Sequence, residues 1–256
     1  MGAWVARQLK DYGASITICD RREEAARETA QRLGVMWMPM DTGYIDSDVV
    51  IVCVPMDNLI QTCQEIGIMM KKGSMMIEIS SVKSGISDVL SETLPEHINY
   101  VSLHPLFGPE TTSLKGQNIV AVKTRSQECT DVVASFLRSK GAEVTFLNAE
   151  DHDYAMAVLQ VLHHFLMLSL IRAIGTLLPE HLMKRELVTN SLRSTLELDA
   201  SILRNLPTIM EIQRANPFSE EVRRRLINEV QNMLEEDPDV LKQKLAEAAK
   251  KISTLL

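Results

Sequence analysis

The chain has 256 residues and a mass of 28.7 kDa, which suits two domains that share one large buried core. Its 45% hydrophobic and 24% charged residues, with 11 glycines and 9 prolines, exclude disordered, collagen-like and multi-span membrane proteins. A formal charge of -7 and an aromatic content of 4% give no electrostatic or stacking basis for binding nucleic acid, so we expect no such partner.

The four cysteines, Cys19, Cys53, Cys63 and Cys129, do not have the spacing of metal ligands. We expect reduced thiols in a cytoplasmic protein and no metal site. The N-terminus lacks the zones of a signal peptide, and Ala6 stands where a myristoylation site needs Ser or Thr. The sequence therefore predicts no membrane attachment.

Short β-branched runs alternate with helical stretches from residue 15 to about residue 147. This alternation predicts a doubly wound parallel sheet with right-handed crossovers, an α/β fold. Helices are expected at 1–9 and 23–33. The run 48–55 is nearly continuously apolar, as in a strand buried on both faces. The strands expected are 15–20, 48–55, 75–79, 100–103, 119–122 and 144–147.

After residue 148 the β-branched character stops, and the chain is predicted to be helical. The breaks fall near prolines 179, 207, 217 and 238. We therefore expect an α/β domain over 1–148 and an all-helical domain over 149–256. The last segment, 219–256, has the pattern of a solvated amphipathic helix.

The first helix of the second domain, at about 151–178, is apolar on nearly every face. Such a helix either spans a membrane or is buried in an interface. Polar residues interrupt it too often for lipid, namely Gln160, His163, His164 and Arg172. This favours a subunit interface, and hence a homodimer formed through the helical domain.

The beginning of the chain has part of a dinucleotide-binding pattern. In the fingerprint G-x-G-x-x-G, glycines let the pyrophosphate approach a helix N-terminus, and an acidic residue about twenty positions later binds the ribose. Gly2 would be the last of these glycines and Asp20 the acidic residue. The expected fold is therefore a Rossmann-like domain without its first strand. The alternative is an ordinary helix start and strand end.

Two segments at predicted strand ends carry the candidate chemistry, Glu-Ile-Ser-Ser-Val-Lys-Ser-Gly at 78–85 and His-Pro-Leu-Phe-Gly-Pro-Glu at 104–110. The carboxyl ends of neighbouring strands are where open α/β sheets bind ligands. With Asp-His-Asp at 151–153 and Gln-Val-Leu-His-His-Phe at 160–165, these motifs make the chain resemble prephenate dehydrogenase of archaeal type. The resemblance covers nearly the whole chain and is poor beyond residue 179.

The resemblance implies an oxidoreductase that oxidises and decarboxylates prephenate to 4-hydroxyphenylpyruvate in tyrosine biosynthesis. His104 matches the catalytic histidine, a base for the proton of the substrate hydroxyl. Ser81 matches a serine that hydrogen-bonds the hydroxyl and the histidine, and His164 matches a histidine that contacts the substrate. For a substrate carboxylate, Arg193 is preferred and Arg204 is second.

The resemblance also implies a nicotinamide cofactor. Asp20 matches the acidic ribose ligand and favours NAD over NADP, because a carboxylate repels a 2′-phosphate. The adjacent Arg21 weakens this preference, so NADP stays possible. The other residues of the expected cofactor set are Gly2, Val54, Pro55 and Ser80.

Two of these residues have an ordinary structural interpretation as well. Ser81 can serve as a helix N-cap before Val82, alone or together with a role in catalysis. Lys83 is assigned to the substrate or cofactor carboxylates, although a lysine in a first helical turn is usually solvated.

Three alternative functions remain. Arogenate dehydrogenase differs only in the group that faces the substrate side chain. A non-catalytic remnant is possible because, without the first strand and two glycines, the pyrophosphate loses most of its backbone donors; we favour a misassigned start codon over a shortened gene. Another oxidoreductase related to 6-phosphogluconate dehydrogenase is disfavoured, since no matching catalytic lysine motif is found in the helical domain.

Overall fold

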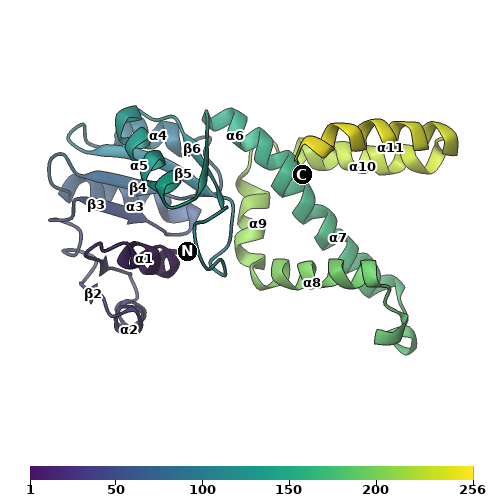
Figure 1. Ribbon diagram of the computed structural model, residues 1–256, viewed down its shortest axis with the longest axis horizontal. Helices are drawn as coiled ribbons and strands as arrows, with labels where there is room; N and C mark the ends of the chain where they lie inside the picture. Colours follow the sequence, from purple (N-terminus) through teal and green to yellow (C-terminus); the bar gives the residue numbers. More distant parts are fainter. Residues whose placement is uncertain (256) are drawn as a thin grey trace. The chain divides into compact units, whose positions relative to one another are not determined.

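The structure is a computed structural model that describes residues 1–255. The chain divides into two compact units (Figure 1). The first unit comprises Met1–Ala155 and Met210–Asn216, and the second comprises Met156–Ile209 and Pro217–Leu256.

The first unit contains a five-stranded sheet in the order β3-β4-β5-β6-β7. Its strands are β3 (Val49–Val52), β4 (Met75–Glu78), β5 (Asn99–Pro105), β6 (Asn118–Val122) and β7 (Glu143–Leu147). All neighbouring pairs are parallel except β5 and β6, which are antiparallel. The α/β class is thus confirmed, but the all-parallel sheet is corrected to a mixed one. The loop 106–117 contains no helix, and an antiparallel pair needs no helical crossover.

A separate two-stranded parallel sheet joins β1 (Thr17–Ile18) to β2 (Met36–Trp37). Within residues 1–255 no backbone ladder joins β1 to β3. The predicted burial of the run 48–55 on both faces is wrong for β3, because in the described chain it is an edge strand. Only Val52 of its four residues is buried, and Val49 is 46% exposed.

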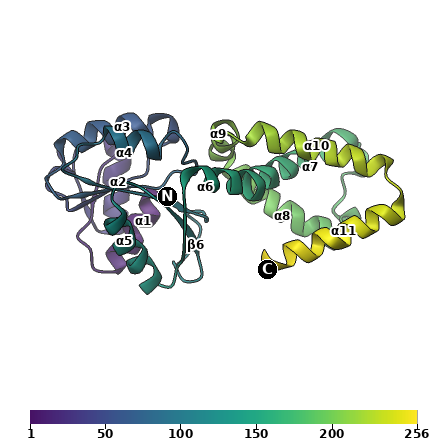
Figure 2. The same ribbon diagram turned by 90° about the horizontal axis from the view of Figure 1, so that it is seen from above.

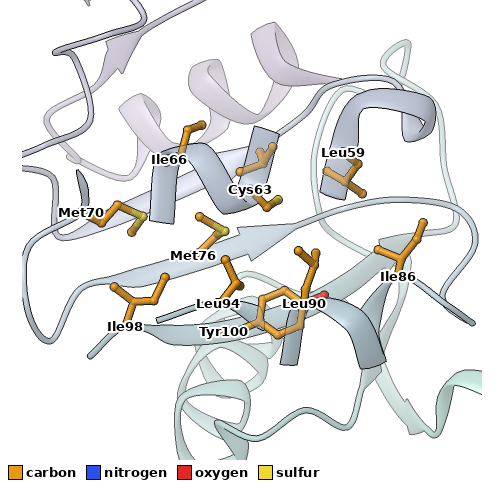
Figure 3. Packing of buried hydrophobic residues seen from close by; sticks show 11 residues of the cluster. Leu59, Cys63, Ile66, Met70, Met76, Ile86, Leu90, Leu94, Ile98 and Tyr100 are labelled. Atoms are coloured by element: carbon orange, nitrogen blue, oxygen red, sulfur yellow. The ribbon is translucent and has the colours of Figure 1, made fainter. Parts of the chain in front are cut away.

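Helices cover both faces of the five-stranded sheet (Figure 2). One layer holds α3 (Met56–Met69) and α4 (Ser87–Thr93), and the opposite layer holds α1 (Gly2–Asp11) and α5 (Gln127–Ser139). Alternation along the central strands supplies both layers with apolar side chains. Met76 packs with Leu59 of α3 and Leu90 of α4, as Figure 3 shows. The next residue along β4, Ile77, packs instead in the layer of α1 and α5.

The predicted helix 23–33 is observed as α2 (Glu23–Leu33). Glu23 and Glu24 lie in its first turn, where negative charge stabilises the helix dipole. Gly34 ends it in the left-handed conformation with φ of 61°, which favours glycine.

The helical part of the chain follows β7. A nearly continuous helical segment, formed by α6 (Ala149–Met156) and α7 (Leu162–Leu177), is interrupted by a π-helical turn at Ala157–Val161. The helix break predicted near Pro238 is confirmed: α10 (Ser219–Glu235) ends before it and α11 (Pro238–Ile252) begins there, because Asp237 caps a new helix with Pro238 in its first turn. The other helices are α8 (Asn190–Arg204) and α9 (Leu206–Ala215).

The helical stretch Ala149–Leu177 is long and apolar enough to cross a membrane, although length and composition alone are weak support for a span. Little of its most apolar window is buried within the chain, and α7 contributes no fully buried residue. Leu166 and Leu177, for example, are 46% and 80% exposed. An apolar surface of this size is unusual for a helix in contact with water.

Candidate active site

A chain of three hydrogen-bonding side chains lies at the carboxyl end of β5. His104 is the next-to-last residue of this strand and is 2% exposed. Its Nδ1 lies 2.8 Å from Nε2 of His152, and Nδ1 of His152 lies 2.7 Å from Oδ1 of Asp153. His152 and Asp153 belong to α6, and both are fully buried. Two predicted motifs, 104–110 and 151–153, therefore meet within the first unit.

The hydrogen-bond partners determine which nitrogen of His104 is basic. The Asp153 carboxylate only accepts, so Nδ1 of His152 carries a hydrogen and donates it. In a neutral His152 the other nitrogen, Nε2, then accepts from Nδ1 of His104. This leaves a lone pair on Nε2 of His104, which has no hydrogen-bond partner among the described residues.

The surroundings of His104 keep its ring neutral. Burial lowers the pKa of His104 well below its usual value, since the imidazolium would lose its hydration; the charges of His152 and Lys83 act in the same direction. A neutral, buried imidazole with one free lone pair is able to act as a general base.

Asp153 connects α6 to the turn that follows β4. Its Oδ1 accepts the backbone N–H of Lys83 at 2.9 Å, and its Oδ2 accepts that of Ser84 at 2.7 Å. Burial by itself would raise the pKa of Asp153, but the hydrogen bonds from His152, Ser84 and Lys83 outweigh it and hold the pKa below its usual value. Sequence reasoning assigned no role to His152 or Asp153. The available signal was the Asp-His-Asp motif soon after the last strand.

Lys83 is a buried structural cation, which corrects its expected role in substrate or cofactor binding. Its Nζ donates to Oε1 of Glu78 at 2.7 Å, to the carbonyl of Leu103 at 2.6 Å and to Oγ of Ser80 at 3.3 Å. These three partners use all three N–H groups of the ammonium. Burial lowers the pKa of Lys83, opposed by the charge of Glu78. The residue is not in a helical turn, since α4 begins at Ser87.

The two serines of this turn differ in their availability. Ser80, expected to contact the cofactor, is buried; its hydroxyl donates to the carbonyl of Val82 at 2.8 Å and its N–H to Oε2 of Glu78 at 2.7 Å. The turn therefore uses these groups, which corrects that expectation. Ser81 is half-buried, and its hydroxyl makes no hydrogen bond with the described residues. It is not a helix N-cap, because Ile86 occupies that position for α4.

The expected cofactor residues lie at helix and strand ends of the first unit. Gly2 begins α1, where a Cβ would lie 3.4 Å from Cβ of Cys53, the residue after β3. No side chain caps the N-terminus of α1, so its first-turn N–H groups are available to an anion. Val54 packs against the α3 and α4 core, and Pro55 occupies the N-cap position of α3 without a side-chain hydrogen bond.

Asp20 follows β1, and its side chain is 43% exposed. Its Oδ1 accepts the N–H of Arg22 at 2.9 Å, and the Arg22 guanidinium lies 3.6 Å away. Arg21 is exposed. The structure thus leaves part of the Asp20 carboxylate open to a ligand.

The predicted substrate residues His164 and Arg193 lie in the second unit. His164 is half-buried in α7 and its Nδ1 has no hydrogen-bond partner; burial, aided by the charge of His163, lowers its pKa to about 4. Arg193 is exposed on α8, without an ion pair among the described residues. Arg204, the second choice, is exposed at the end of the same helix.

Comparison with known proteins places the chain in a family. The sequence profile described as "Prephenate dehydrogenase, nucleotide-binding domain" matches residues 5–146, more than half of the chain. The chain belongs to the prephenate dehydrogenase family. The resemblance deduced from the motifs at strand ends is thereby confirmed, and this part of the chain is a nucleotide-binding domain.

Among curated proteins, the chain is similar to the probable arogenate/prephenate dehydrogenase of Methanocaldococcus jannaschii, 27% identical over 240 residues. That alignment covers 92% of this chain and 54% of the relative. The T-protein of Haemophilus influenzae is 28% identical over 166 residues, which cover 64% of this chain and 40% of the relative. The chain thus spans about half or less of the length of these relatives.

Solved structures share the fold. Prephenate dehydrogenase from A. aeolicus, crystallised with hydroxyphenyl propionate and NAD+, superimposes with a TM-score of 0.74 at 17% identity, covering 100% of this chain and 95% of that one. Synechocystis arogenate dehydrogenase gives a TM-score of 0.72 at 18% identity, covering 100% of this chain and 96% of that one.

The ion pair of Lys83 gives a stability prediction. Lys83→Met leaves the Glu78 carboxylate buried without its countercharge and should destabilise the first unit by about 3–5 kcal/mol. Lys71→Met is the matched control, since Lys71 pairs with an exposed Asp48 and should cost about 1 kcal/mol or less. Urea unfolding followed by tryptophan fluorescence measures both, because Trp4 and Trp37 lie in this unit. Equal losses in the two variants would contradict a buried ion pair.

Proposed function

We propose that this chain is an NAD-dependent prephenate dehydrogenase, which oxidises and decarboxylates prephenate to 4-hydroxyphenylpyruvate. The observation that carries the proposal is the free lone pair on Nε2 of a neutral, buried His104 at the carboxyl edge of the sheet. Membership of the family supports this choice of reaction. Arogenate dehydrogenase is the second candidate, because the relatives include a probable arogenate/prephenate dehydrogenase and an arogenate dehydrogenase from Arabidopsis thaliana.

The described residues fit a dinucleotide. The uncapped N-terminus of α1 at Gly2 offers N–H groups to a pyrophosphate, and the half-exposed Asp20 carboxylate offers acceptors to ribose hydroxyls. Val54 and Pro55, after β3, would lie beside the nicotinamide ribose. NAD, when bound, supplies the acceptor for the hydride.

His104 takes the proton in the proposed reaction. Nε2 of His104 accepts the proton of the substrate hydroxyl while the ring carbon that carries this hydroxyl loses a hydride, and a carbonyl forms. Loss of CO2 then sends the electrons of the broken C–C bond through the ring to this oxygen, and the resulting phenolate takes a proton back from Nε2 of His104, which gives the aromatic phenol. The free hydroxyl of Ser81 is proposed to hydrogen-bond the reacting hydroxyl, and His164 and Arg193 to bind the remainder of the substrate.

We further propose that the chain is a cytoplasmic homodimer joined through its helical domain. Support comes from α7, which is apolar, contributes no fully buried residue in the single chain and carries polar residues such as His163 and Arg172 that lipid disfavours. A second copy of the chain would remove this surface from water, which is the main driving force for such association.

The role of His104 has a direct test. His104→Asn should lower kcat for prephenate by roughly 10²-fold or more, since the side-chain amide cannot take the proton. His181→Asn, at an exposed position of the second unit, should leave kcat unchanged. Steady-state kinetics with prephenate and with arogenate measure both variants and also show which substrate the enzyme prefers. Wild-type turnover by His104→Asn would refute the mechanism.

Cofactor choice depends on Asp20. Calorimetric titration should show that NAD binds more tightly than NADP, and Asp20→Asn should reduce NAD affinity about tenfold, the scale of a hydrogen bond to a charged group. Asp41→Asn, which removes another exposed carboxylate of the same unit, serves as the control. If the wild-type chain binds neither nucleotide, the non-catalytic alternative is favoured.

The dimer is tested by sedimentation equilibrium. The wild-type chain should have twice the monomer mass of 28.7 kDa, and Leu166→Glu should shift it toward the monomer by placing a charge on the apolar face of α7. Met36→Glu, on the first unit, is the control for a general effect of added charge. A monomeric wild-type chain, or its recovery with membranes, would contradict the proposal.

A further inference from the structure

The hydrogen-bonded chain of His104, His152 and Asp153 extends beyond what a single general base needs. Nδ1 of His104 lies 2.8 Å from Nε2 of His152, and Nδ1 of His152 lies 2.7 Å from Oδ1 of Asp153. All three side chains are at most 2% exposed. The carboxylate at its far end is fixed by the backbone N–H groups of Lys83 and Ser84. Asn216 also donates to the backbone carbonyl of Asp153, at 2.8 Å. Groups from several parts of the first unit therefore fix these three hydrogen-bonded side chains in place.

We propose that His152 and Asp153 are positioning residues that fix the reactive tautomer of His104 and receive the proton this histidine takes from the substrate. The proposal rests on the function proposed above. His152 reaches the reacting atoms only through His104.

The first part of the proposal follows from the tautomers. An isolated neutral imidazole exchanges its hydrogen between its two nitrogens, and only the form with a lone pair on Nε2 leaves His104 a base. Acceptance by His152 holds the hydrogen of His104 on Nδ1, and Asp153 in turn orients His152. Asp153 thus holds His152 in the tautomer that accepts at Nε2, and His152 holds His104 in the tautomer with a lone pair on Nε2.

The second part follows from where positive charge is tolerated. As the substrate O–H bond breaks, Nε2 of His104 gains the proton; Nδ1 of His104 then releases its own proton to Nε2 of His152. His104 is neutral again, and the charge lies on His152, whose Nδ1 is 2.7 Å from the Asp153 carboxylate. No atom or electron is left over, because one N–H bond forms on each histidine and one breaks on His104.

The charged groups that face this chain favour that final state. The Lys83 ammonium disfavours positive charge on His104 and is itself paired with Glu78. Asp153 is the carboxylate in contact with His152. Transfer of the proton therefore moves the charge onto the histidine that is paired with a carboxylate.

The informative variant is His152→Gln. The glutamine carbonyl can still accept from Nδ1 of His104, so the tautomer is retained, but it cannot take the proton. We expect kcat to fall about 10- to 100-fold with little change in KM, the range for a lost proton-transfer group.

Two comparisons separate this role from simple structural support. His181→Gln, which removes an exposed histidine of the second unit, should change neither kcat nor KM. A His152→Gln variant whose KM rises while kcat stays unchanged would refute the proton-receiving role, as would wild-type kinetics.

The tautomer can be measured without any turnover. Nitrogen-15 NMR of the histidine rings in the full chain should show the hydrogen of His104 on Nδ1 in the wild type and in His152→Gln, and a loss of this preference in His152→Phe. A wild-type hydrogen on Nε2 would overturn the positioning role even in an active enzyme. A chain without turnover but with the hydrogen on Nδ1 would instead refute the proposed function and support the positioning.

Discussion

The contact on which the site depends is the one between the Asp153 carboxylate and the turn after β4. The two backbone N–H groups of Lys83 and Ser84 and the ring of His152 converge on this one side chain. A carboxylate with three donors keeps its charge even when buried, since each hydrogen bond replaces one lost to water. Through His152 this fixed charge sets the donor and acceptor pattern of His104, and so the chemistry available at the end of β5.

A buried ion pair, Lys83 with Glu78, lies in the same region and helps to position it. Lys83 and Glu78 are both fully buried, and removing two ions from water has a large cost that their attraction only partly offsets. The ammonium also donates to the carbonyl of Leu103, the residue before His104, so the pair joins β4 to β5 next to the candidate base. Its positive charge disfavours an imidazolium at His104. The ion pair thus contributes to both the geometry and the electrostatics of the site.

Local patterns in the sequence were sufficient for much of the first unit. Helix α2 and strand β4 were predicted from the alternation of charged helical stretches with short strand-like runs, because such patterns act between residues close in the chain. The pattern of 48–55 predicted a strand but not its edge position, since pairing depends on distant segments. Strand β2, with two residues, is too short for any periodicity to show.

The sequence by itself determined the fold class, the family and the place of His104 at a strand end, because motifs and periodicity record these locally. Only the tertiary structure decided what surrounds that histidine. His152 lies 48 positions away along the chain, and Asp153 meets Lys83 across 70 positions. Burial of Lys83, which a local pattern predicts to be solvated, results from the same long-range packing. Hydrogen-bond partners and desolvation are properties of the folded neighbourhood, and no spacing of residue types specifies them.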